Sequence, residues 1–166
     1  MPVIYINIGS NNGDRQALIG QAVAAVNSAF PDADVRCSAP VETEPWGFES
    51  EHKFLNLGVA IDAPRQETNP ASLLRLLKRL QEIEKSIDPS PHRDSNGNYI
   101  DRAIDIDLIA VDEIIVRTPE LTLPHPRMHL RDFVLIPMKE LAPAWTHPEL
   151  HITAAQLAAT LDGRTD

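Results

Sequence analysis

The order of strand-like and helix-like segments is the feature that most restricts the fold of this chain. Strand character is found at residues 3–8, 35–38, 54–61 and 104–111, and helical spacing of apolar residues at 14–30 and 69–87. The resulting order, strand, helix, strand, strand, helix, strand, predicts an α+β fold with a ferredoxin-like antiparallel sheet and helices packed on it. Fold alone assigns no chemistry.

Local signals place the ends of both helices and the main loops. Asp14 is a typical N-cap residue for the first helix, and Asn69 followed by Pro70 is a typical start for the second, which we expect to end near Ile87. Residues 39–53 and 86–101 are rich in Pro, Gly or polar residues and predict two long loops, a length that is usually functional in a compact domain. Added C-terminal elements are a short apolar piece at 114–116, a helical turn or two within 128–141, and an amphipathic helix at 154–161.

One carboxylate in the second helix is predicted to point inward. The apolar stripe of this helix consists of Leu73, Leu76, Leu77, Leu80, Ile83 and Ile87. On the same helical wheel Glu84 falls inside the stripe and Gln81 on its flank. An inward carboxylate needs a partner, which the sequence does not identify.

Length and composition restrict the class of protein. The 166 residues, 43% of them hydrophobic, favour a single domain over residues 1–166. A formal net charge of -9 argues against general nucleic-acid binding. The single cysteine, Cys37, forms no internal disulfide, and no apolar run approaches the ~18 to 20 residues of a membrane span. We therefore expect a cytoplasmic monomer that binds neither nucleic acid nor membrane.

The alternation around two aspartates is the sharpest chemical signal. In the segment 102–108, RAIDIDL, strand periodicity places Asp105 and Asp107 on one face and the flanking apolar residues on the other. Two carboxylates about 6 to 7 Å apart suit one or two Mg²⁺ ions, which prefer oxygen ligands and complete their shells with water and phosphates. The alternative is an ordinary solvated strand face whose acids lie beside Arg102.

A cluster of basic residues follows in an otherwise acidic chain. The segment 122–133, TLPHPRMHLRDF, contains two histidines and two arginines, which suit a polyphosphate. The alternative is a solvated turn with capping residues. His125 and His129 lie four residues apart but lack the pattern of a zinc site. We expect the histidines without evident partners, His52, His147 and His151, to lie at the surface.

The loop 42–48, ETEPWGF, and the segment Phe54-Leu55-Asn56 indicate a site for a flat heterocycle. Aromatic side chains can sandwich such a ring, and an Asn amide can donate to its edge and accept from it. The alternative packs these aromatics into the core and leaves Asn56 as a strand-end residue. The turn at 9–11, Gly-Ser-Asn, lacks the lysine of a phosphate-binding loop, so we interpret it as structural.

Taken in order, these segments resemble the 6-hydroxymethyl-7,8-dihydropterin pyrophosphokinase family of folate biosynthesis. The resemblance rests on residues 8–11 (IGSN), 43–47 (TEPWG), 54–56 (FLN), 81–84 (QEIE), 102–107 (RAIDID), 123–125 (LPH) and 131–133 (RDF). It covers nearly the whole chain, and the spacing between the last three segments is its most specific part. The resemblance implies transfer of a pyrophosphoryl group from ATP to the hydroxymethyl oxygen of the pterin, which leaves AMP.

The resemblance also implies roles for individual residues. Asp105 and Asp107 match the pair that holds two Mg²⁺ ions, and they are catalytic together with Arg93 and Arg102. The positions that match the pterin site are Thr43, Glu44, Pro45, Trp46, Phe54, Asn56 and Phe133, the last as an aromatic stacked on the ring. The positions that match the ATP side are Gln81, Glu84, Arg93, Arg102, Leu108, Thr122, His125 and Arg131.

The chain departs from the family pattern in the loop after the second helix. Where members commonly carry a Gly-Arg-x-Arg segment, residues 88–93 read DPSPHR, so Arg93 is the one clear arginine. Tyr99 stands near the place where some members have a loop tryptophan and is expected to supply an aromatic cover. Glu120 stands where some members have a basic residue near the nucleotide. These differences affect turnover and loop closure more than reaction type.

Two other classes of function stay open on the residues alone. A ferredoxin-like sheet can serve as a nucleic-acid or regulatory binding module, although the charge of -9 and the lack of a basic aromatic face count against it. A Mg²⁺-dependent phosphohydrolase could also use the two aspartates. The products separate these classes: pterin diphosphate with AMP indicates the kinase, and pterin-independent release of phosphate indicates the hydrolase.

Overall fold

The computed structural model describes residues 2–45, 50–90 and 93–161. Its strands are β1 (Val3–Ser10), β2 (Asp34–Cys37), β3 (Val41–Thr43), β4 (Phe54–Asp62), β5 (Asp105–Val111), β6 (Val116–Arg117) and β7 (Thr122–Leu123). Its helices are α1 (Arg15–Ala29), α2 (Pro70–Ile87), the 3-10 turn η1 (Met128–Leu130), α3 (Asp132–Leu141) and α4 (Ala154–Ala159).

The main sheet is antiparallel and has β1 and β4 at its centre. The strand order is β2-β4-β1-β5, and β3 pairs with β4 beyond the end of β2. The two short strands β6 and β7 form a separate hairpin. The sheet with its packed helices confirms the predicted α+β class.

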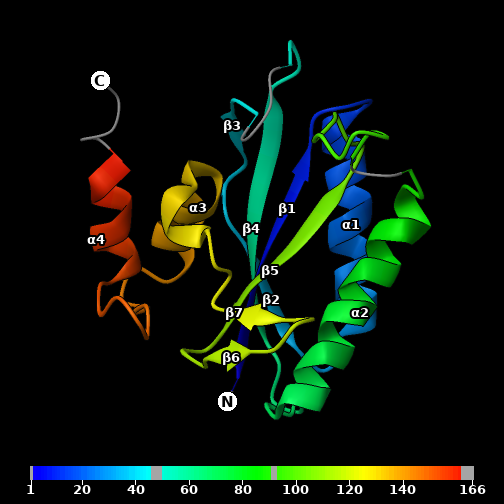
Figure 1. The fold of residues 1–166 in the computed structure, drawn as a ribbon. Coiled ribbons are helices and arrows are strands. Elements are labelled where there is room, and N and C mark those ends of the chain that lie inside the picture. Colours follow the sequence, from blue (N-terminus) through cyan, green and yellow to red (C-terminus); the bar gives the residue numbers. More distant parts are fainter. Residues whose placement is uncertain (1, 46–49, 91–92, 162–166) are drawn as a thin grey trace.

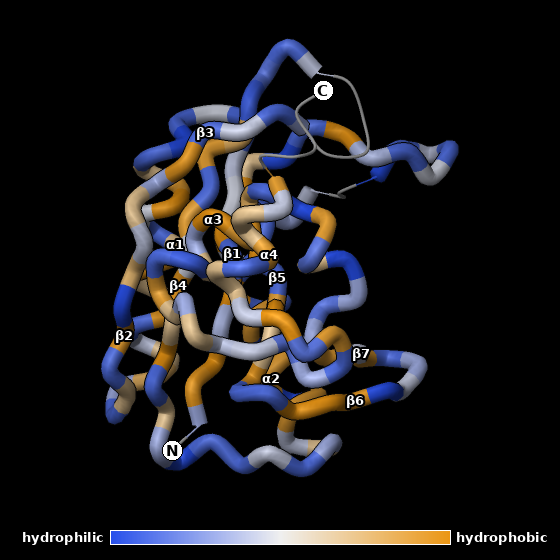
Figure 2. The backbone as a smooth tube through the Cα atoms, turned by 90° about the vertical axis from the view of Figure 1, so that its left-hand side faces the viewer, coloured by the Kyte–Doolittle hydropathy of each residue, from blue (hydrophilic) through white to orange (hydrophobic). Residues whose placement is uncertain are grey.

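The helices form layers on both faces of this sheet (Figure 1). Helices α1 and α2 pack on one face, over a core that contains Ile4, Ile6 and Ile8 of β1. Helix α3 packs on the other face against β4 and β3, and α4 packs on α3, around Tyr5 and Ile109. The alternation of side chains along β1 therefore serves two separate cores. Hydrophilic segments occupy much of the outline of the molecule in Figure 2.

Both predicted helix starts are confirmed. Asp14 Oδ1 accepts a hydrogen bond from the backbone N–H of Ala17 (3.1 Å). Asn69 Oδ1 accepts one from the N–H of Ser72 (2.9 Å), and Pro70 opens α2. Each cap satisfies a backbone donor that the first turn of a helix leaves without a partner.

Three local predictions were wrong. Residues 39–53 were expected to be a loop throughout, but β3 lies within them and pairs with the start of β4. The helix expected within 128–141 is present, but the prediction of a turn or two was too short, because the segment forms η1 and the ten-residue α3. His147 was expected at the surface, yet it is 6% exposed and lies edge-on to Trp145, with 5.8 Å between the ring centroids.

A β-bulge interrupts the pairing of β1 with β5. Tyr5 pairs with Ala110 and the next residue, Ile6, pairs with Leu108, so Ile109 is the extra residue. Both Ile109 and Ala110 consequently belong to the core under α3, although they are adjacent in sequence.

Among the described residues no helix is long and apolar enough to cross a membrane.

Gly58 determines how closely α3 approaches the sheet, which gives a first prediction. A Cβ built at Gly58 would lie 2.5 Å from Cβ of Pro137 in α3, so Gly58→Ala should push the helix away from β4. We expect the free energy of unfolding to fall by about 1 to 3 kcal/mol, measured by urea unfolding.

Gly20 provides the matched control. A Cβ at this exposed position in α1 meets nothing within 4 Å, and Ala is the better helix former by up to about 1 kcal/mol. Gly20→Ala should therefore stabilise the protein. A Gly58→Ala protein as stable as the unmodified one would contradict the packing described here.

Candidate active site

The register of the sheet brings polar residues from three strands into two adjacent rows. Gly9 of β1 pairs with Asn56 of β4 on one side and with Asp105 of β5 on the other. Two residues earlier in β1, Asn7 pairs with Gly58 of β4 and with Asp107 of β5. Paired residues of an antiparallel sheet point to the same face. These side chains therefore share the face on which α3 lies.

The two rows form the floor of a pocket. It is lined by residues of β1, β4 and β5, of the connection between α2 and β5, and of the start of α3: Asn7, Gly9, Phe54, Asn56, Tyr99, Arg102, Asp105, Asp107, Arg131 and Phe133. Seven of these residues belong to the site that the sequence predicted: Phe54, Asn56, Arg102, Asp105, Asp107, Arg131 and Phe133. The structure thus brings together the two aspartates, two of the three predicted arginines, and two of the three aromatic residues predicted for the pterin site, Phe54 and Phe133.

The two aspartates point into the pocket, as the alternation predicted, and an arginine approaches each. Arg102 Nη1 lies 3.0 Å from Asp105 Oδ2, and Arg131 Nη1 lies 3.8 Å from Asp107 Oδ2. Burial and the negative charge of Asp105 raise the pKa of Asp107 well above its usual range, against the opposing effect of Arg131. Two carboxylates on one face whose charges act on each other favour a bound cation, which would relieve their repulsion.

Glu84 has the inward direction that the helical wheel predicted, and one of its partners is a backbone group. Its Oε2 accepts a hydrogen bond from the N–H of Ile106 (2.7 Å), the residue between the two aspartates. Burial, followed by the charge of Asp105, raises the pKa of Glu84 although this hydrogen bond lowers it. Glu84 thus fixes the edge of β5 from the side of α2.

The residues predicted for the pterin side lie at different depths. Phe54, Asn56 and Phe133 line the pocket. Buried Thr43 lies behind Asn56 and accepts a hydrogen bond at its Oγ1 from Asn56 Nδ2 (2.8 Å). Glu44 is exposed and lies 3.4 Å from Lys53 Nζ, Pro45 is half-buried, and Trp46 lies outside the described residues.

The loop arginine, Arg93, does not line the pocket. It is exposed, stacks on the ring of Tyr99 at 4.3 Å from the centroid, and donates from Nη2 to the Tyr99 hydroxyl (2.7 Å). Tyr99 itself lines the pocket, where an aromatic cover was expected. Among the contacts of the described residues, Arg93 is therefore joined to the pocket through this tyrosine.

His125 is held beside β5 by the β-bulge. Its backbone N–H donates to the carbonyl of the bulged residue Ile109 (2.7 Å). Its Nδ1 accepts from the N–H of Arg127 (3.2 Å), so the neutral imidazole carries its proton on Nε2. Burial, together with the charges of Arg131 and Arg127, lowers the pKa of His125 to about 4. A neutral Nε2–H donor is therefore available at neutral pH.

Of the residues predicted for the ATP side, Arg102 and Arg131 line the pocket, whereas Glu84, His125 and the three that follow do not. Gln81 is exposed on α2, and Thr122 is exposed on β7. Leu108 is 5% exposed and packs in the core between the sheet and α2. The side chain of Leu108 is therefore not presented to the pocket.

Asn7 is a pocket residue that sequence reasoning missed. It is 4% exposed, and its Oδ1 is buried with no hydrogen-bond partner among the described residues. The available signal was a single polar residue inside the apolar segment 3–8. Gly9 beside it leaves room for the neighbouring amide, because a Cβ there would lie 2.8 Å from Asn56 Oδ1.

The pocket fits a metal-bound polyphosphate. Within the described ranges no group of three or more His, Cys, Asp or Glu side chains forms a complete metal cage. Two carboxylates and nearby oxygen atoms nevertheless suit Mg²⁺, which is usually bound by one or two carboxylates plus substrate phosphates. Arginines on the same floor suit phosphate oxygens, and the aromatic walls suit a planar ring. The fold and this pocket define an enzyme of phosphoryl-group transfer.

Comparisons with known proteins identify the family. The model of the 7,8-dihydro-6-hydroxymethylpterin-pyrophosphokinase (HPPK) family matches residues 5–143. A 2-amino-4-hydroxy-6-hydroxymethyldihydropteridine pyrophosphokinase of Porphyromonas gingivalis is 41% identical over 150 residues, which are 90% of this chain and 96% of the relative. The protein of the same name from Bacillus subtilis is 34% identical over 139 residues, 84% of this chain and 77% of the relative.

Solved structures support the fold. The Plasmodium falciparum HPPK-DHPS wild type with pteroate has a TM-score of 0.69 and is 14% identical. The match covers 98% of this chain and 43% of that longer chain, and it carries the fold alone.

The chain belongs to the HPPK family, as its sequence motifs indicated. It is an ATP-dependent pterin pyrophosphokinase of folate biosynthesis, with ATP as its co-substrate.

The environment of His125 predicts a pH dependence of stability. The pKa is about 4 in the folded protein and about 6.5 in the unfolded chain, so between these values the unfolded chain binds the extra proton. Stability should therefore fall as the pH drops from about 6.5 to 4, by roughly 3 kcal/mol in all, and His125 should contribute no further change below that window.

The comparison of unfolding curves with His125→Asn tests this prediction. The Asn amide oxygen can accept from Arg127 N–H as Nδ1 does, but the side chain does not titrate. The variant should lose this part of the pH dependence. Its free energy of unfolding should therefore be closer to that of the unmodified protein at pH 5 than at pH 7. An NMR titration in which His125 of the folded protein protonates near pH 6.5 would show that its pKa is not lowered and that this prediction is wrong.

Proposed function

We propose that the pocket on the α3 face of the sheet is the site of pyrophosphoryl transfer. Its aromatic residues would bind the pterin, and its carboxylates and arginines would bind the metal-bound triphosphate. The single observation that carries this proposal is the row formed by Asn56, Gly9 and Asp105 across three paired strands. The row carries the amide that we assign to a heterocycle and the carboxylate that we assign to a metal-bound phosphate, on the two strands that flank β1. The reacting ends of two substrates need this proximity.

The pterin would lie between Phe54 and Phe133, with Asn56 at its edge. Both rings line the pocket, and stacking on aromatic faces suits a flat heterocycle. The hydrogen bond from Asn56 Nδ2 to Thr43 Oγ1 fixes the amide, so that Asn56 Oδ1 is available to the N–H groups of the ring. Glu44, Pro45 and Trp46 belong to the same proposed side by their place in the sequence.

The triphosphate would lie over Asp105 and Asp107 with Mg²⁺. We propose two ions, which when bound would neutralise phosphate charge and polarise the hydroxymethyl oxygen. Arg102 and Arg131 approach this position from two sides and would bind phosphate oxygens, and the Nε2–H of His125 would donate to another. Gln81, Glu84, Leu108 and Thr122 would line the remaining ATP side, with Leu108 acting through its backbone.

In the reaction the hydroxymethyl oxygen forms a bond to the β-phosphorus of ATP. The bond from the β-phosphorus to the oxygen that bridges it to the α-phosphate breaks, AMP leaves with that oxygen, and the proton of the hydroxymethyl group is released to solvent. The protein residues position both substrates and stabilise the charge that develops on the phosphate oxygens. We further propose that residues 1–166 act as one domain, in the cytoplasm and as a monomer.

Asparagine substitutions at the two aspartates test the metal assignment. Asp105→Asn and Asp107→Asn keep the side-chain shape but remove an anionic ligand, so AMP production should fall by about 100-fold or more. Stability without Mg²⁺ should hold or rise for Asp107→Asn, because burial and Asp105 disfavour its charged form. Product analysis and thermal unfolding measure the two effects.

A merely structural role for the pair gives the reverse result. It predicts a less stable protein with near-normal AMP production per folded molecule. Substantial AMP production from both folded variants would remove the metal assignment. Pterin-independent release of phosphate by the unmodified protein would instead favour a phosphohydrolase.

Arg93→Ala tests the loop arginine. We expect turnover to fall by about 10-fold or more while the pterin dissociation constant changes little, since a guanidinium that meets developing phosphate charge acts chiefly in the transition state. Arg36→Ala is the control, because this exposed arginine of β2 donates to the carbonyl of Leu141 outside the pocket. Unchanged turnover with weakened pterin binding would show that Arg93 serves the pterin instead.

A further inference from the structure

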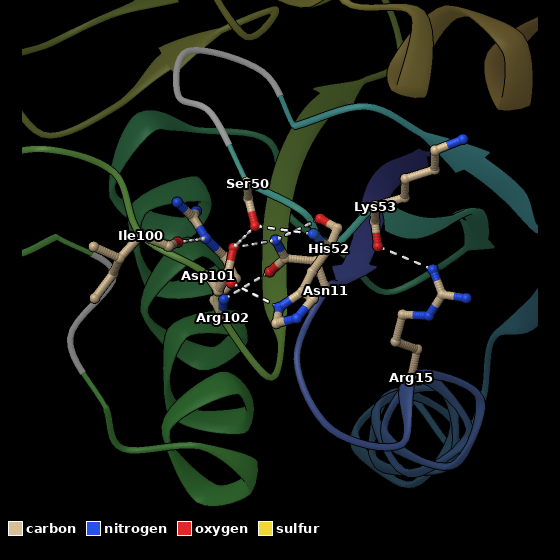
Figure 3. Close-up of polar contacts among 8 residues, drawn as sticks. All are labelled: Asn11, Arg15, Ser50, His52, Lys53, Ile100, Asp101 and Arg102. Atoms are coloured by element: carbon tan, nitrogen blue, oxygen red, sulfur yellow. Dashed lines mark hydrogen bonds and ion pairs between the residues drawn. The ribbon is translucent and has the colours of Figure 1, made fainter.

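Asp101 lies outside the pocket but joins three segments that border it (Figure 3). Ser50 Oγ donates to Asp101 Oδ1 (2.6 Å), and Asn11 Nδ2 donates to the same oxygen (2.7 Å). His52 Nδ1 lies 2.9 Å from Asp101 Oδ2. The partners come from the β3–β4 connection and the β1–α1 turn, while Asp101 precedes β5. One carboxylate therefore ties together segments about 40 to 90 residues apart in sequence.

The hydrogen bonds to Asp101 keep its carboxylate in the charged form at neutral pH. Burial raises the pKa of Asp101, but the hydrogen bonds from Ser50, His52 and Asn11 outweigh that effect and bring the pKa below its usual value. A carboxylate that accepts several hydrogen bonds is a stronger anchor than a neutral group. Asp101 is therefore an anchor for its three partners at neutral pH.

Asn11 connects Asp101 to the backbone of Arg102. The backbone N–H of Arg102 donates to Asn11 Oδ1 (2.7 Å), and the N–H of Asn11 donates to the carbonyl of Arg102 (3.1 Å). Asn11 is 2% exposed, and its amide is held by Asp101 and by the carbonyl of His52 (3.1 Å). Both backbone polar groups of Arg102 are thus fixed through one asparagine.

The side chain of Arg102 depends on this backbone. It is 9% exposed, reaches Asp105 at 3.0 Å and lies over the ring of Phe54 at 5.9 Å from the centroid. His52 is two residues before Phe54, so the same anchor reaches the aromatic wall of the pocket. A shift of about 1 Å in such a group can reduce turnover about 100-fold.

We propose that Asp101 is a positioning residue for pyrophosphoryl transfer, which holds Arg102 through Asn11 and holds the segment before Phe54 through Ser50 and His52. The proposal rests on the proposed function of Arg102 and Asp105. Asp101 touches no reacting atom and acts by fixing where the phosphate-binding and pterin-binding walls stand relative to each other.

Two substitutions at Asp101 separate positioning from stability. Asp101→Ala should lower kcat by about 10- to 100-fold, with a smaller change in the pterin KM, and should speed hydrogen exchange of the Arg102 amide in the ligand-free protein. Asp101→Asn keeps an oxygen that can accept from Ser50 and Asn11, so it should recover most of kcat and of the protection.

Arg15→Ala is the matched control. Arg15 joins α1 to the same segment before β4 through the carbonyl of Lys53 (2.9 Å), and joins α1 to β3 through Glu42 (3.0 Å). No hydrogen bond in Figure 3 joins it to Asp101 or Arg102. It should change thermal stability while kcat and exchange at Arg102 stay as in the unmodified protein.

The outcomes decide the proposal. Unchanged kcat and unchanged Arg102 exchange in folded Asp101→Ala would overturn it, and so would an equal loss of kcat in Arg15→Ala. If Asp101→Ala does not fold, Ser50→Ala removes one donor alone and should still lower kcat to a smaller extent, and an unaffected kcat there would also overturn it. Exchange at Arg102 is measured without substrate, so its response is separate from any failure of the proposed function.

Discussion

The pairing of β1 with its two neighbours is the constraint on which the site depends. Ile4, Ile6 and Ile8 of β1 are buried under α1 and α2, and the same alternation turns Asn7 and Gly9 to the other face. A slip of one residue against β5 would turn the aspartates into the apolar core, so burial of the isoleucines also fixes the face on which the pocket lies. The site is thus a consequence of the hydrophobic pattern on the opposite side of the sheet.

Helix α3 completes the pocket because it can approach the sheet closely. Gly58 leaves space for Pro137, so the start of α3 brings Arg131 and Phe133 to the edge of the polar rows. The bulge at Ile109 contributes from the other strand, because its carbonyl accepts the backbone N–H of His125. Departures from regular structure, a glycine and a bulge, therefore position residues that regular pairing alone would not bring together.

Patterns that repeat along one element could be predicted from the sequence. The alternation of Asp105 and Asp107, the inward direction of Glu84 and the two helix caps depend on local geometry, and the structure has them as expected. The bulge could not be predicted, because strand periodicity carries no sign of an extra residue. The burial of His147 depends on ring contacts with Trp145 and His129, which only the tertiary fold supplies. The alternation also indicated a Mg²⁺ site at the two aspartates, whereas the roles proposed for the other residues one by one came from the family resemblance.

The contacts within the pocket connect the two proposed substrate sites. Arg102 lies over Phe54 and Tyr99, at 5.9 Å and 5.5 Å from the centroids, and Arg131 lies over Phe133 at 5.3 Å. Under the proposed function, a pterin that stacks between the two phenylalanines competes with the guanidinium groups for the same ring faces. A polyphosphate competes with the carboxylates for the same arginines. Each substrate therefore acts on the groups that the other must meet, because the arginines are shared between the aromatic walls and the carboxylate floor.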